Sequence, residues 1–443
     1  MPDTIIALAT PPGTSALAVL RLSGPDSFSL TSQLTPVASA SQSHRCYYQT
    51  LKYEGDLIDE VMITYFHGPR SYTGEDTVEI TCHGNPLIIQ RILQTYLKLG
   101  ARMSLPGEFT QRAFLNGKLD LTQAESVIDV IEATTLEALR GAHAILEGAL
   151  GQRMQTLRIR LIDLLAHLEA YIDFPDEDIK PETGQQFIDS VRLTLNEVHE
   201  LISSAPLGKI LREGVATVII GSPNVGKSSL FNALLRSERA IVSPIPGTTR
   251  DLIETACNVG GFHLRLIDTA GQRTTEDMVE SEGVKRALHA LSQADLILYL
   301  VDASQPRISD SFQPPEPLPH QHFISVAHKS DLGVHPDHHQ KIAVSSKTGE
   351  GLKQLEESIR QKLNGGRDLE KQGWLTINAR QEAALSHAEE ALLRSLNALM
   401  KSDPPELASI HLREALQSIG EVVGLATNED ILDALFSKFC IGK

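Results

Sequence analysis

The sequence contains little cysteine and no long apolar run. Only four of its 443 residues are cysteine, and their wide separation fits reduced thiols rather than a disulfide framework or a metal site: Cys46, Cys82, Cys257 and Cys440. No apolar stretch reaches the roughly 18 residues that cross a bilayer, and Ile5 to Ala9 is too short for a signal peptide. The sequence therefore predicts a cytoplasmic protein without a membrane segment.

Positive charge is also scarce. The 40 Lys and Arg residues are outnumbered by 56 Asp and Glu residues, which leaves a formal net charge of −16 at pH 7. Such a balance argues against a surface that coats nucleic acid, so any RNA binding must use a local basic patch or a partner protein. The length itself predicts about three domains.

The residue pattern outside the middle of the chain predicts an α+β segment and two helical segments. Residues 1–118 alternate short apolar runs with Gly, Pro and Ser, which is typical of an α+β domain. Residues 119–213 and 364–443 carry helical periodicity. In the first of these, an apolar stripe predicts a helix that packs in a bundle: Leu150, Met154, Leu157, Leu161, Leu164 and Leu168.

Residues 214–363 alternate strand-like with helix-like stretches. Five strands are predicted: Val215 to Ile220, Leu264 to Ile267, Leu296 to Val301, Phe323 to Ala327 and Ile342 to Val344. This alternation indicates a parallel, doubly wound sheet. The simplest architecture is a multidomain α/β chain, in which a Ras-like P-loop G domain is inserted into an α-helical domain and preceded by the α+β domain.

Gly221 to Ser228 reads GSPNVGKS and fits the phosphate-binding pattern GxxxxGK[ST] at every fixed position. It stands between a predicted strand and a predicted helix. In that setting backbone N–H groups surround the phosphates, Lys227 reaches the β- and γ-oxygens, and Ser228 binds Mg²⁺. The run predicts nucleotide hydrolysis, with GTP contacts from Asn224, Val225, Gly226, Lys227, Ser228 and Ser229.

Two later strings follow in the order expected of nucleotide switch segments. In Gly247 to Asp251 (GTTRD), Thr249 is the candidate ligand of Mg²⁺ and the γ-phosphate. Directly after a predicted strand, Asp268 to Gly271 (DTAG) offers a carboxylate for Mg²⁺ and a glycine beside the γ-phosphate. The predicted GTP site therefore extends to Ser243, Pro244, Ile245, Pro246, Gly247, Thr248, Thr249, Asp268, Thr269, Ala270 and Gly271.

Base recognition is expected from two loops that follow the last two predicted strands. Asp331 can accept hydrogen bonds from the ring N–H and the exocyclic amine of guanine, an arrangement that adenine does not offer. The usual GTPase motif is NKxD, whereas this chain has HKSD, so we expect His328 to alter guanine affinity or selectivity. The full set is His328, Lys329, Asp331, Ser345, Ser346 and Lys347.

Together, GSPNVGKS, GTTRD, DTAG, HKSD and the carboxy-terminal FCIGK resemble the tRNA-modification GTPase family called MnmE or TrmE. The resemblance covers nearly the whole chain. It includes five N-terminal strings: Ala9 to Gly13, Arg21 to Gly24, Tyr72 to Asp76, Pro106 to Phe109 and Asn116 to Leu121.

The resemblance implies a homodimer in which each chain has a folate-binding and dimerisation domain, a helical domain and an inserted G domain. It implies a heterotetramer with MnmG, an FAD-containing partner, which adds a carboxymethylaminomethyl-type group at C5 of the wobble uridine of certain tRNAs. The one-carbon donor is 5-formyl- or methylene-tetrahydrofolate. Matched residue by residue, the folate contacts fall on Arg21, Glu79, Lys118 and Lys443.

The resemblance also implies K⁺ beside the nucleotide, where it offsets charge that develops between the β- and γ-phosphates. Its ligands fall on Asn224, Ser243, Ile245 through the carbonyl, and Thr248. Two residues compete to orient the attacking water. Glu280 aligns with the family's glutamate, whereas Gln272 stands directly after DTAG, as in Ras-like enzymes.

Two smaller features leave alternatives open. Cys440 takes part in the one-carbon transfer if the tail lies beside the folate, as the family implies, or it is a structural thiol. The histidines in His335 to His339 are expected to be solvated, with metal binding as the lesser alternative.

A second functional class also fits the G-domain motifs, namely a GTPase switch in ribosome assembly that binds RNA without modifying it. The roughly 210 residues before the G domain and the CIGK ending favour the tRNA-modification class.

Overall fold

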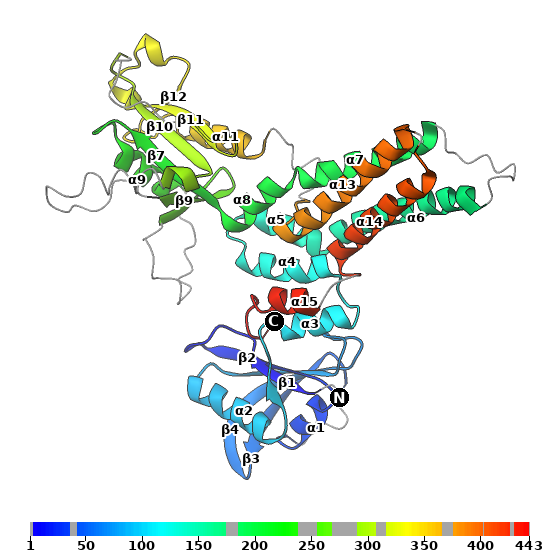
Figure 1. Ribbon diagram of the computed structural model, residues 1–443. Helices are drawn as coiled ribbons and strands as arrows, with labels where there is room; N and C mark the ends of the chain where they lie inside the picture. Colours follow the sequence, from blue (N-terminus) through cyan, green and yellow to red (C-terminus); the bar gives the residue numbers. More distant parts are fainter. Residues whose placement is uncertain are drawn as a thin grey trace, which may run out of the picture. The chain divides into compact units, whose positions relative to one another are not determined.

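The chain folds into two compact units (Figure 1). Unit 1 combines residues 1–128, 150–163 and 416–443, and unit 2 combines residues 129–149 and 164–415. The computed structural model describes residues 3–35, 42–173, 185–237, 255–267, 290–306, 316–365, 375–401, 403–425 and 429–442. Three helices run from one unit into the other: α4 (Leu121–Glu132), α6 (Ala149–Asp173) and α14 (Pro405–Val423).

Unit 1 is built on a six-stranded sheet in the order β3-β4-β5-β2-β1-β6. All neighbours are antiparallel except β1 and β6, which pair in parallel. The strands are β1 (Ile5–Leu8), β2 (Leu17–Ser23), β3 (Arg45–Tyr53), β4 (Asp56–Phe66), β5 (Thr77–His83) and β6 (Arg102–Met103). The side chains of β2 alternate, so Leu20 and Leu22 face the core and Arg21 faces the other side.

Two helices contribute to the core of this sheet, α1 (Ser27–Ser32) and α2 (Pro86–Lys98). The Asn85 side chain caps α2 by accepting a hydrogen bond from Leu87 N at 2.9 Å, and Pro86 occupies its first turn, where no N–H donor is needed. Ile92 and Tyr96 on α2 are buried against the sheet. Helix α2 thus supplies the helical part of the α+β domain predicted for this segment.

The rest of unit 1 joins segments from the two ends of the chain. Helix α3 (Glu108–Leu115) packs against α15 (Glu429–Phe436). After α15, the chain returns to the sheet, where a Cβ added to Gly442 would lie 2.3 Å from the carbonyl oxygen of Leu8. Only glycine permits so close an approach, so the C-terminal segment is fitted against the end of β1.

Unit 2 contains a second six-stranded sheet in the order β12-β11-β10-β7-β9-β8. Its strands are β7 (Val215–Gly221), β8 (Thr255–Val259), β9 (Phe262–Ile267), β10 (Leu296–Asp302), β11 (His322–His328) and β12 (Ile342–Val344). The five predicted strands are present and parallel. The sequence analysis missed β8, which pairs antiparallel with β9 at the sheet edge.

Both faces of this sheet are covered. One face carries Val215, Leu264 and Leu296, and the opposite face carries Val218 and Ile297. Helices α9 (Lys227–Ser237) and α11 (Leu352–Leu363) pack on the sheet (Figure 1). Short 3₁₀ turns occupy Ser330–Leu332 and Pro336–His338. Burial on both sides explains why the strands are nearly continuous apolar runs.

The helices of unit 2 include α5 (Leu136–Leu146), α7 (Gln185–Ile202), α8 (Ala205–Glu213) and α13 (Ala379–Lys401). Helices α7 and α13 pack side by side (Figure 1). On α7, buried residues recur at three- and four-residue steps: Phe187, Val191, Thr194, Val198 and Leu201. On α6, all six residues of the predicted apolar stripe are buried, which confirms that interpretation.

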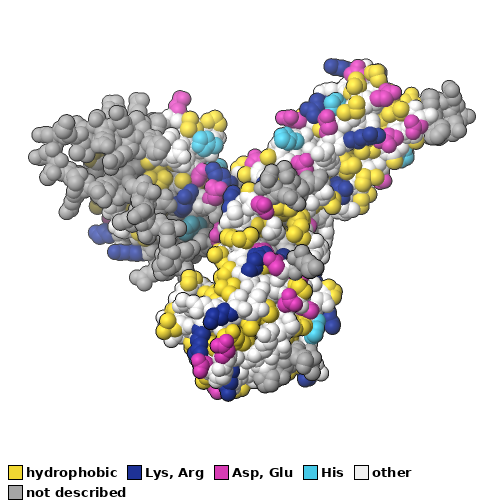
Figure 2. Space-filling view, turned by 60° about the horizontal axis from the view of Figure 1, so that its bottom comes forward, with side chains coloured by type: hydrophobic (Ala, Val, Ile, Leu, Met, Phe, Trp, Pro, Cys, Tyr) yellow, Lys and Arg dark blue, Asp and Glu magenta, His cyan; other side chains and the backbone are white. Residues whose placement is uncertain are grey.

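The described surface carries charges of both signs. On the face drawn in Figure 2, Lys and Arg side chains are interspersed with Asp and Glu side chains rather than gathered into one broad basic area. This distribution agrees with the excess of acidic residues in the sequence. Among the described residues, none of the helices is long and apolar enough to span a bilayer.

Candidate functional site

The phosphate loop connects the central strand β7 to helix α9. The strand ends at Gly221, the helix begins at Lys227, and the chain reverses direction between them. Asn224 takes part in this turn with a left-handed φ of 58°. A strand, a tight loop and a helix N-terminus in this order present backbone N–H groups to an anion. The loop therefore has the local architecture that the motif predicts.

Lys227 lies across the loop that precedes it. Its Nζ donates hydrogen bonds to the carbonyl oxygens of Gly221 at 2.8 Å and Ser222 at 3.0 Å. Partial burial lowers the pKa of the ammonium group because it disfavours the charged form. Ser228 follows in the first turn of α9 with its side chain exposed. A cation and a hydroxyl are thus placed together at the helix N-terminus.

A second loop leaves the sheet at the end of β11. Lys329 has a left-handed φ of 64°, and its Nζ donates to Asp302 Oδ2 at 2.7 Å. Asp302 ends β10, the strand next to β11. Burial opposes ionisation of Asp302, but hydrogen bonds from Lys329 and Ser304 outweigh it and lower the pKa of its carboxyl group. The sequence analysis did not single out Asp302, although an acidic residue at the end of a parallel strand was a visible signal.

Asp331 is oriented by the loop after β12. The hydroxyl of the buried Ser345 donates to Asp331 Oδ1 at 2.7 Å. Asp331 itself is exposed. Lys347, which lies in the same loop as Ser345, is exposed as well. A fixed, accessible carboxylate at this place suits the recognition of a base with two neighbouring N–H donors.

His328 is buried between the two loops and the phosphate loop, with 3% of its surface exposed. Its Nδ1 lies 2.9 Å from Val225 O, and its Nε2 lies 2.7 Å from Ser346 Oγ. Both ring nitrogens therefore have protein partners. Sequence reasoning considered His328 only as a contact of the base and missed these contacts.

Several predicted site residues lie outside the described residues. They are Ser243, Pro244, Ile245, Pro246, Gly247, Thr248, Thr249, Asp268, Thr269, Ala270, Gly271, Gln272, Glu280 and Lys443. Of the predicted GTP contacts, the structure brings together the phosphate loop and the two base-side loops at the carboxyl edge of one parallel sheet.

A separate polar cluster lies on the sheet of unit 1. Arg21 on β2 faces Glu79 on β5, and its Nε and Nη2 donate to Glu79 Oε1 at 2.9 and 2.8 Å. The Arg21 guanidinium lies over the rings of Tyr72 and Phe109, at 5.3 and 5.8 Å from their centroids. Its Nη1 is buried and has no hydrogen-bond partner among the described residues. The Arg21 side chain is only 14% exposed.

The other predicted residues of this cluster are more accessible. Lys118 is exposed and its Nζ donates to Pro69 O at 2.9 Å. Cys440 is exposed, and its carbonyl oxygen accepts a hydrogen bond from Gly107 N at 3.4 Å. Gly442 lies against Leu8, the residue next to Ala7, and Ala7 pairs with Arg21 across β1 and β2. The C-terminal segment therefore lies near the strand that carries Arg21.

The cysteines and histidines that the structure describes form no metal site. All four cysteines are free, with Cys82 and Cys257 buried and Cys46 and Cys440 exposed. Within the described ranges, no three His, Cys, Asp or Glu side chains gather as metal ligands. The expectation of solvated histidines is wrong for His338, which is buried because its Nε2 contacts Gln305 O at 2.9 Å.

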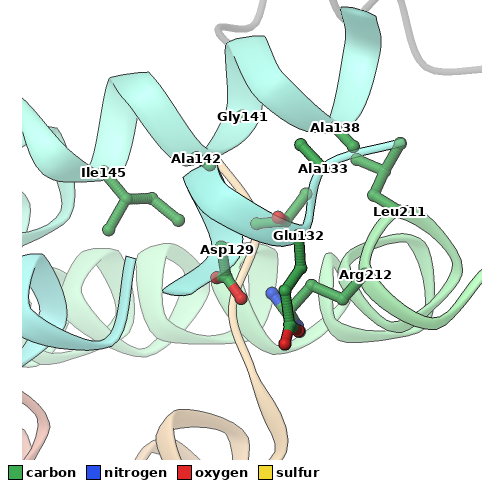
Figure 3. Close-up of a pocket in the computed structure, with 10 residues that line it drawn as sticks. Asp129, Glu132, Ala133, Ala138, Gly141, Ala142, Ile145, Leu211 and Arg212 are labelled. Carbon is green, nitrogen blue, oxygen red and sulfur yellow. The ribbon is translucent and has the colours of Figure 1, made fainter. Parts of the chain in front are cut away.

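A small cavity in unit 2 lies away from the phosphate loop in the fold. It encloses about 30 Å³, which is on the scale of one water molecule. Figure 3 shows Asp129 and Glu132 of α4, Ile145 of α5 and Leu211 and Arg212 of α8 around it. This cavity is too small for a nucleotide or a folate.

Known proteins resemble the chain over its whole length. Two family models match, described as the MnmE helical domain over residues 121–440 and the GTP-binding protein TrmE N-terminus over residues 4–118. A tRNA modification GTPase MnmE from Akkermansia muciniphila is 44% identical over 99% of both chains. Its counterpart from Aquifex aeolicus is 43% identical over 100% of both chains.

A solved structure of Era from Aquifex aeolicus bound to GDP.AlF4⁻ is 28% identical over 40% of this chain and 66% of that one, with a TM-score of 0.25. The two family models and the full-length relatives decide the assignment, and the chain belongs to the MnmE family of tRNA modification GTPases.

Proposed function

We propose that this chain is a K⁺-stimulated GTPase that works with an FAD-containing MnmG-type partner on tRNA. The pair adds a carboxymethylaminomethyl-type group at C5 of the wobble uridine of certain tRNAs, with a tetrahydrofolate as one-carbon donor. One observation supports the proposal most strongly. In a chain of the MnmE family, the loops that contain Lys227, Asp331 and Ser345 lie together at one edge of the same sheet.

In this proposal GTP hydrolysis uses the phosphate loop of unit 2. Lys227 contacts the β- and γ-phosphates, and Asp331, held by Ser345, selects guanine. Glu280 or Gln272 orients the attacking water. The exposed Ser228 hydroxyl fits Mg²⁺, which prefers oxygen ligands, and Thr249 completes the protein's share of that site.

The K⁺ ligands in this proposal are Asn224, Ser243, Ile245 and Thr248. Asn224 fits the role because its exposed side chain carries an amide oxygen beside the phosphate loop, at the left-handed position of the turn. A bound cation there supplies positive charge near the phosphates during hydrolysis. Lys227 and the α9 N-terminus would add their own positive charge to that of the ion.

The folate site in this proposal centres on Arg21 in unit 1. The buried Nη1 of Arg21, which has no hydrogen-bond partner among the described residues, fits an oxygen of the ligand, because an unmade hydrogen bond at a buried donor costs free energy. Glu79, Lys118 and Lys443 complete the site. The bound tetrahydrofolate supplies the one-carbon unit, and the aromatic rings of Tyr72 and Phe109 hold Arg21 in orientation. Cys440 is the candidate residue for the transfer.

The assembly that we propose is a cytoplasmic homodimer joined to two copies of the flavoprotein. Its substrate is tRNA, as the names of the relatives state for those proteins. The mixed surface charge supports delivery of the tRNA through the partner rather than through a broad basic area of this chain.

The test is a reconstituted modification assay with purified chain, flavoprotein, GTP, a folate donor and varied K⁺. We expect modified uridine only in the complete mixture and faster GTP hydrolysis in K⁺ than in Na⁺. If GTP is hydrolysed at the same rate in Na⁺ as in K⁺, the proposed role of potassium is wrong. If the complete mixture yields no modified uridine, the proposed role in tRNA modification is wrong.

The ribosome-assembly alternative is tested in parallel. Retention of tetrahydrofolate by the purified chain supports the proposal. Cosedimentation with ribosomal subunits that needs no folate would favour the assembly switch instead.

A further inference from the structure

His328 stands where the usual GTPase motif has asparagine, and the structure places it among three loops that are distant in sequence. Val225 belongs to the phosphate loop, His328 ends β11, and Ser346 follows β12. We infer that His328 is a positioning residue whose ring, with a proton on Nδ1, connects the phosphate loop to the base-side loop. The inference rests on the proposed binding of GTP at this site.

The tautomer follows from the partners. The carbonyl oxygen of Val225 can only accept, so the hydrogen bond at 2.9 Å requires a proton on Nδ1 of His328. In the neutral ring Nε2 then accepts, and the Ser346 hydroxyl donates to it at 2.7 Å.

The ring also touches the backbone of the phosphate loop. A Cβ added to Gly226 would lie 2.3 Å from Cε1 and Nδ1 of His328, so the imidazole packs where any other residue would place its side chain. Gly226 precedes Lys227, and its carbonyl oxygen accepts from Leu230 N at 2.9 Å within the first turn of α9. A displacement of the ring would therefore disturb Lys227 and the start of the helix.

On its other side, the ring fixes the loop that orients the base-recognition carboxylate. Ser346 is adjacent to Ser345, which donates to Asp331 Oδ1 at 2.7 Å. One side chain thus couples the residues facing the phosphates with those facing the base. We expect nucleotide affinity, rather than the fold of the sheet, to depend on it.

Two substitutions separate the contacts by geometry. The amide nitrogen of asparagine reaches the place of Nδ1, so His328→Asn retains the bond to Val225 and loses the one to Ser346. The amide of glutamine reaches the place of Nε2, so His328→Gln retains the Ser346 side and loses the Val225 side. His328→Leu removes both while keeping a similar volume, and Ser346→Ala removes one partner only.

The first experiment is ¹⁵N NMR of the histidine side chains in the nucleotide-free full chain, with His328 assigned through the His328→Asn spectrum. We expect the proton on Nδ1 and none on Nε2 at pH 8. A ring that carries its proton on Nε2 instead overturns the inference. This measurement does not depend on GTP binding, so it stands even if the proposed function fails.

The second experiment is release of a fluorescent GDP analogue from the same variants, with His320→Asn as the control because His320 is exposed. Loss of a buried hydrogen bond predicts on the order of tenfold faster release for His328→Leu and His328→Gln. We expect His328→Asn and Ser346→Ala, which lose the contact on the base side only, to release the analogue several-fold faster, and only the His320→Asn control to match the parent chain. An unchanged release rate in His328→Gln overturns the inference. This variant still decides the question if His328→Leu does not fold.

Discussion

Arg21 and Glu79 face each other across β2 and β5, and two nitrogens of the Arg21 guanidinium share a single oxygen of Glu79. The arrangement holds the planar group in one orientation and leaves Nη1 buried without a partner in the described part of unit 1. The cost of that unmade bond is recovered when a ligand oxygen meets it. This orientation supports the proposal that Arg21 donates to an acceptor group of the folate.

We predict that Arg21→Ala weakens tetrahydrofolate binding by about 10- to 100-fold, since a hydrogen bond to a charged group contributes about 1.5–3 kcal/mol. Titration calorimetry measures the affinity. The control is Arg45→Ala, an exposed arginine on β3 of the same sheet. Equal affinities for the two variants would contradict the placement of folate at Arg21.

Lys227→Ala should reduce GTP hydrolysis on the order of 100-fold or more, because it removes a charge aimed at the phosphates. Phosphate release at saturating GTP is the measurement. Lys353→Ala on α11 is a suitable control, since Lys353 is exposed. A variant of Lys227 that keeps its full rate would show that the lysine has no part in the reaction.

The water-orienting residue is predicted to be Glu280, with Gln272 as the competitor. Single-turnover hydrolysis of Glu280→Ala and Gln272→Ala compares them directly. We expect the larger loss of rate for Glu280→Ala, because the residues around it follow the family. The reverse order would assign the role to Gln272, as in Ras-like enzymes.

Asp3 should contribute to acid stability in unit 1. Hydrogen bonds from Arg102, followed by its charge and by Arg112, hold the pKa of the Asp3 carboxyl at about 2, below its ordinary 3.8. The folded chain then binds fewer protons than the unfolded chain, so the free energy of unfolding falls as the pH drops from about 4 to 2. Asp3→Asn should flatten that fall.

Urea unfolding at several acidic pH values, followed through the methyl NMR signals of the buried Ile5 and Ile6, measures the effect locally. Asp3 has 51% of its side chain exposed, so we expect a small change. Asp56→Asn, at an 80% exposed carboxylate, is the comparison. Identical pH dependence in the parent chain and Asp3→Asn would refute the prediction.

When the folded chain reacts with a disulfide reagent at pH 8, two of the four thiols should react fast and the other two slowly. Burial raises the pKa of Cys82 to about 11 and that of Cys257 to about 12, which leaves little thiolate. Cys46 and Cys440 are exposed and should react first. Four equal rates in the folded chain would be incompatible with this burial, and four fast thiols are expected after denaturation.

Features that depend on neighbouring residues in the sequence were predictable. The β-branched run before the phosphate loop gave β7 to within one residue, and the motif located Lys227 at the start of a helix. The edge strand β8 (TACNV) was missed because it has neither a continuous apolar run nor a strict alternation of apolar and polar residues. The Gly260-Gly261 pair between β8 and β9 was a usable hairpin signal.

Features that depend on distant partners were not predictable from one sequence. The burial of Arg21 requires Glu79, 58 positions later in the chain, and the burial of His338 requires the Gln305 carbonyl, 33 positions earlier. The two contacts of His328 reach residues 103 and 18 positions away. No local periodicity carries such information, because these contacts exist only after the sheets have formed.

Gly442 allows the C-terminal segment to lie against Leu8. This contact affects the order in which the two units can finish folding during synthesis on the ribosome. Unit 1 uses residues 416–443, which are translated after all of unit 2. The first sheet can form early, but the helix α15 and the tail that pack beside it arrive last. The nucleotide-binding sheet therefore leaves the ribosome, and can fold, before the unit that precedes it in the sequence is finished.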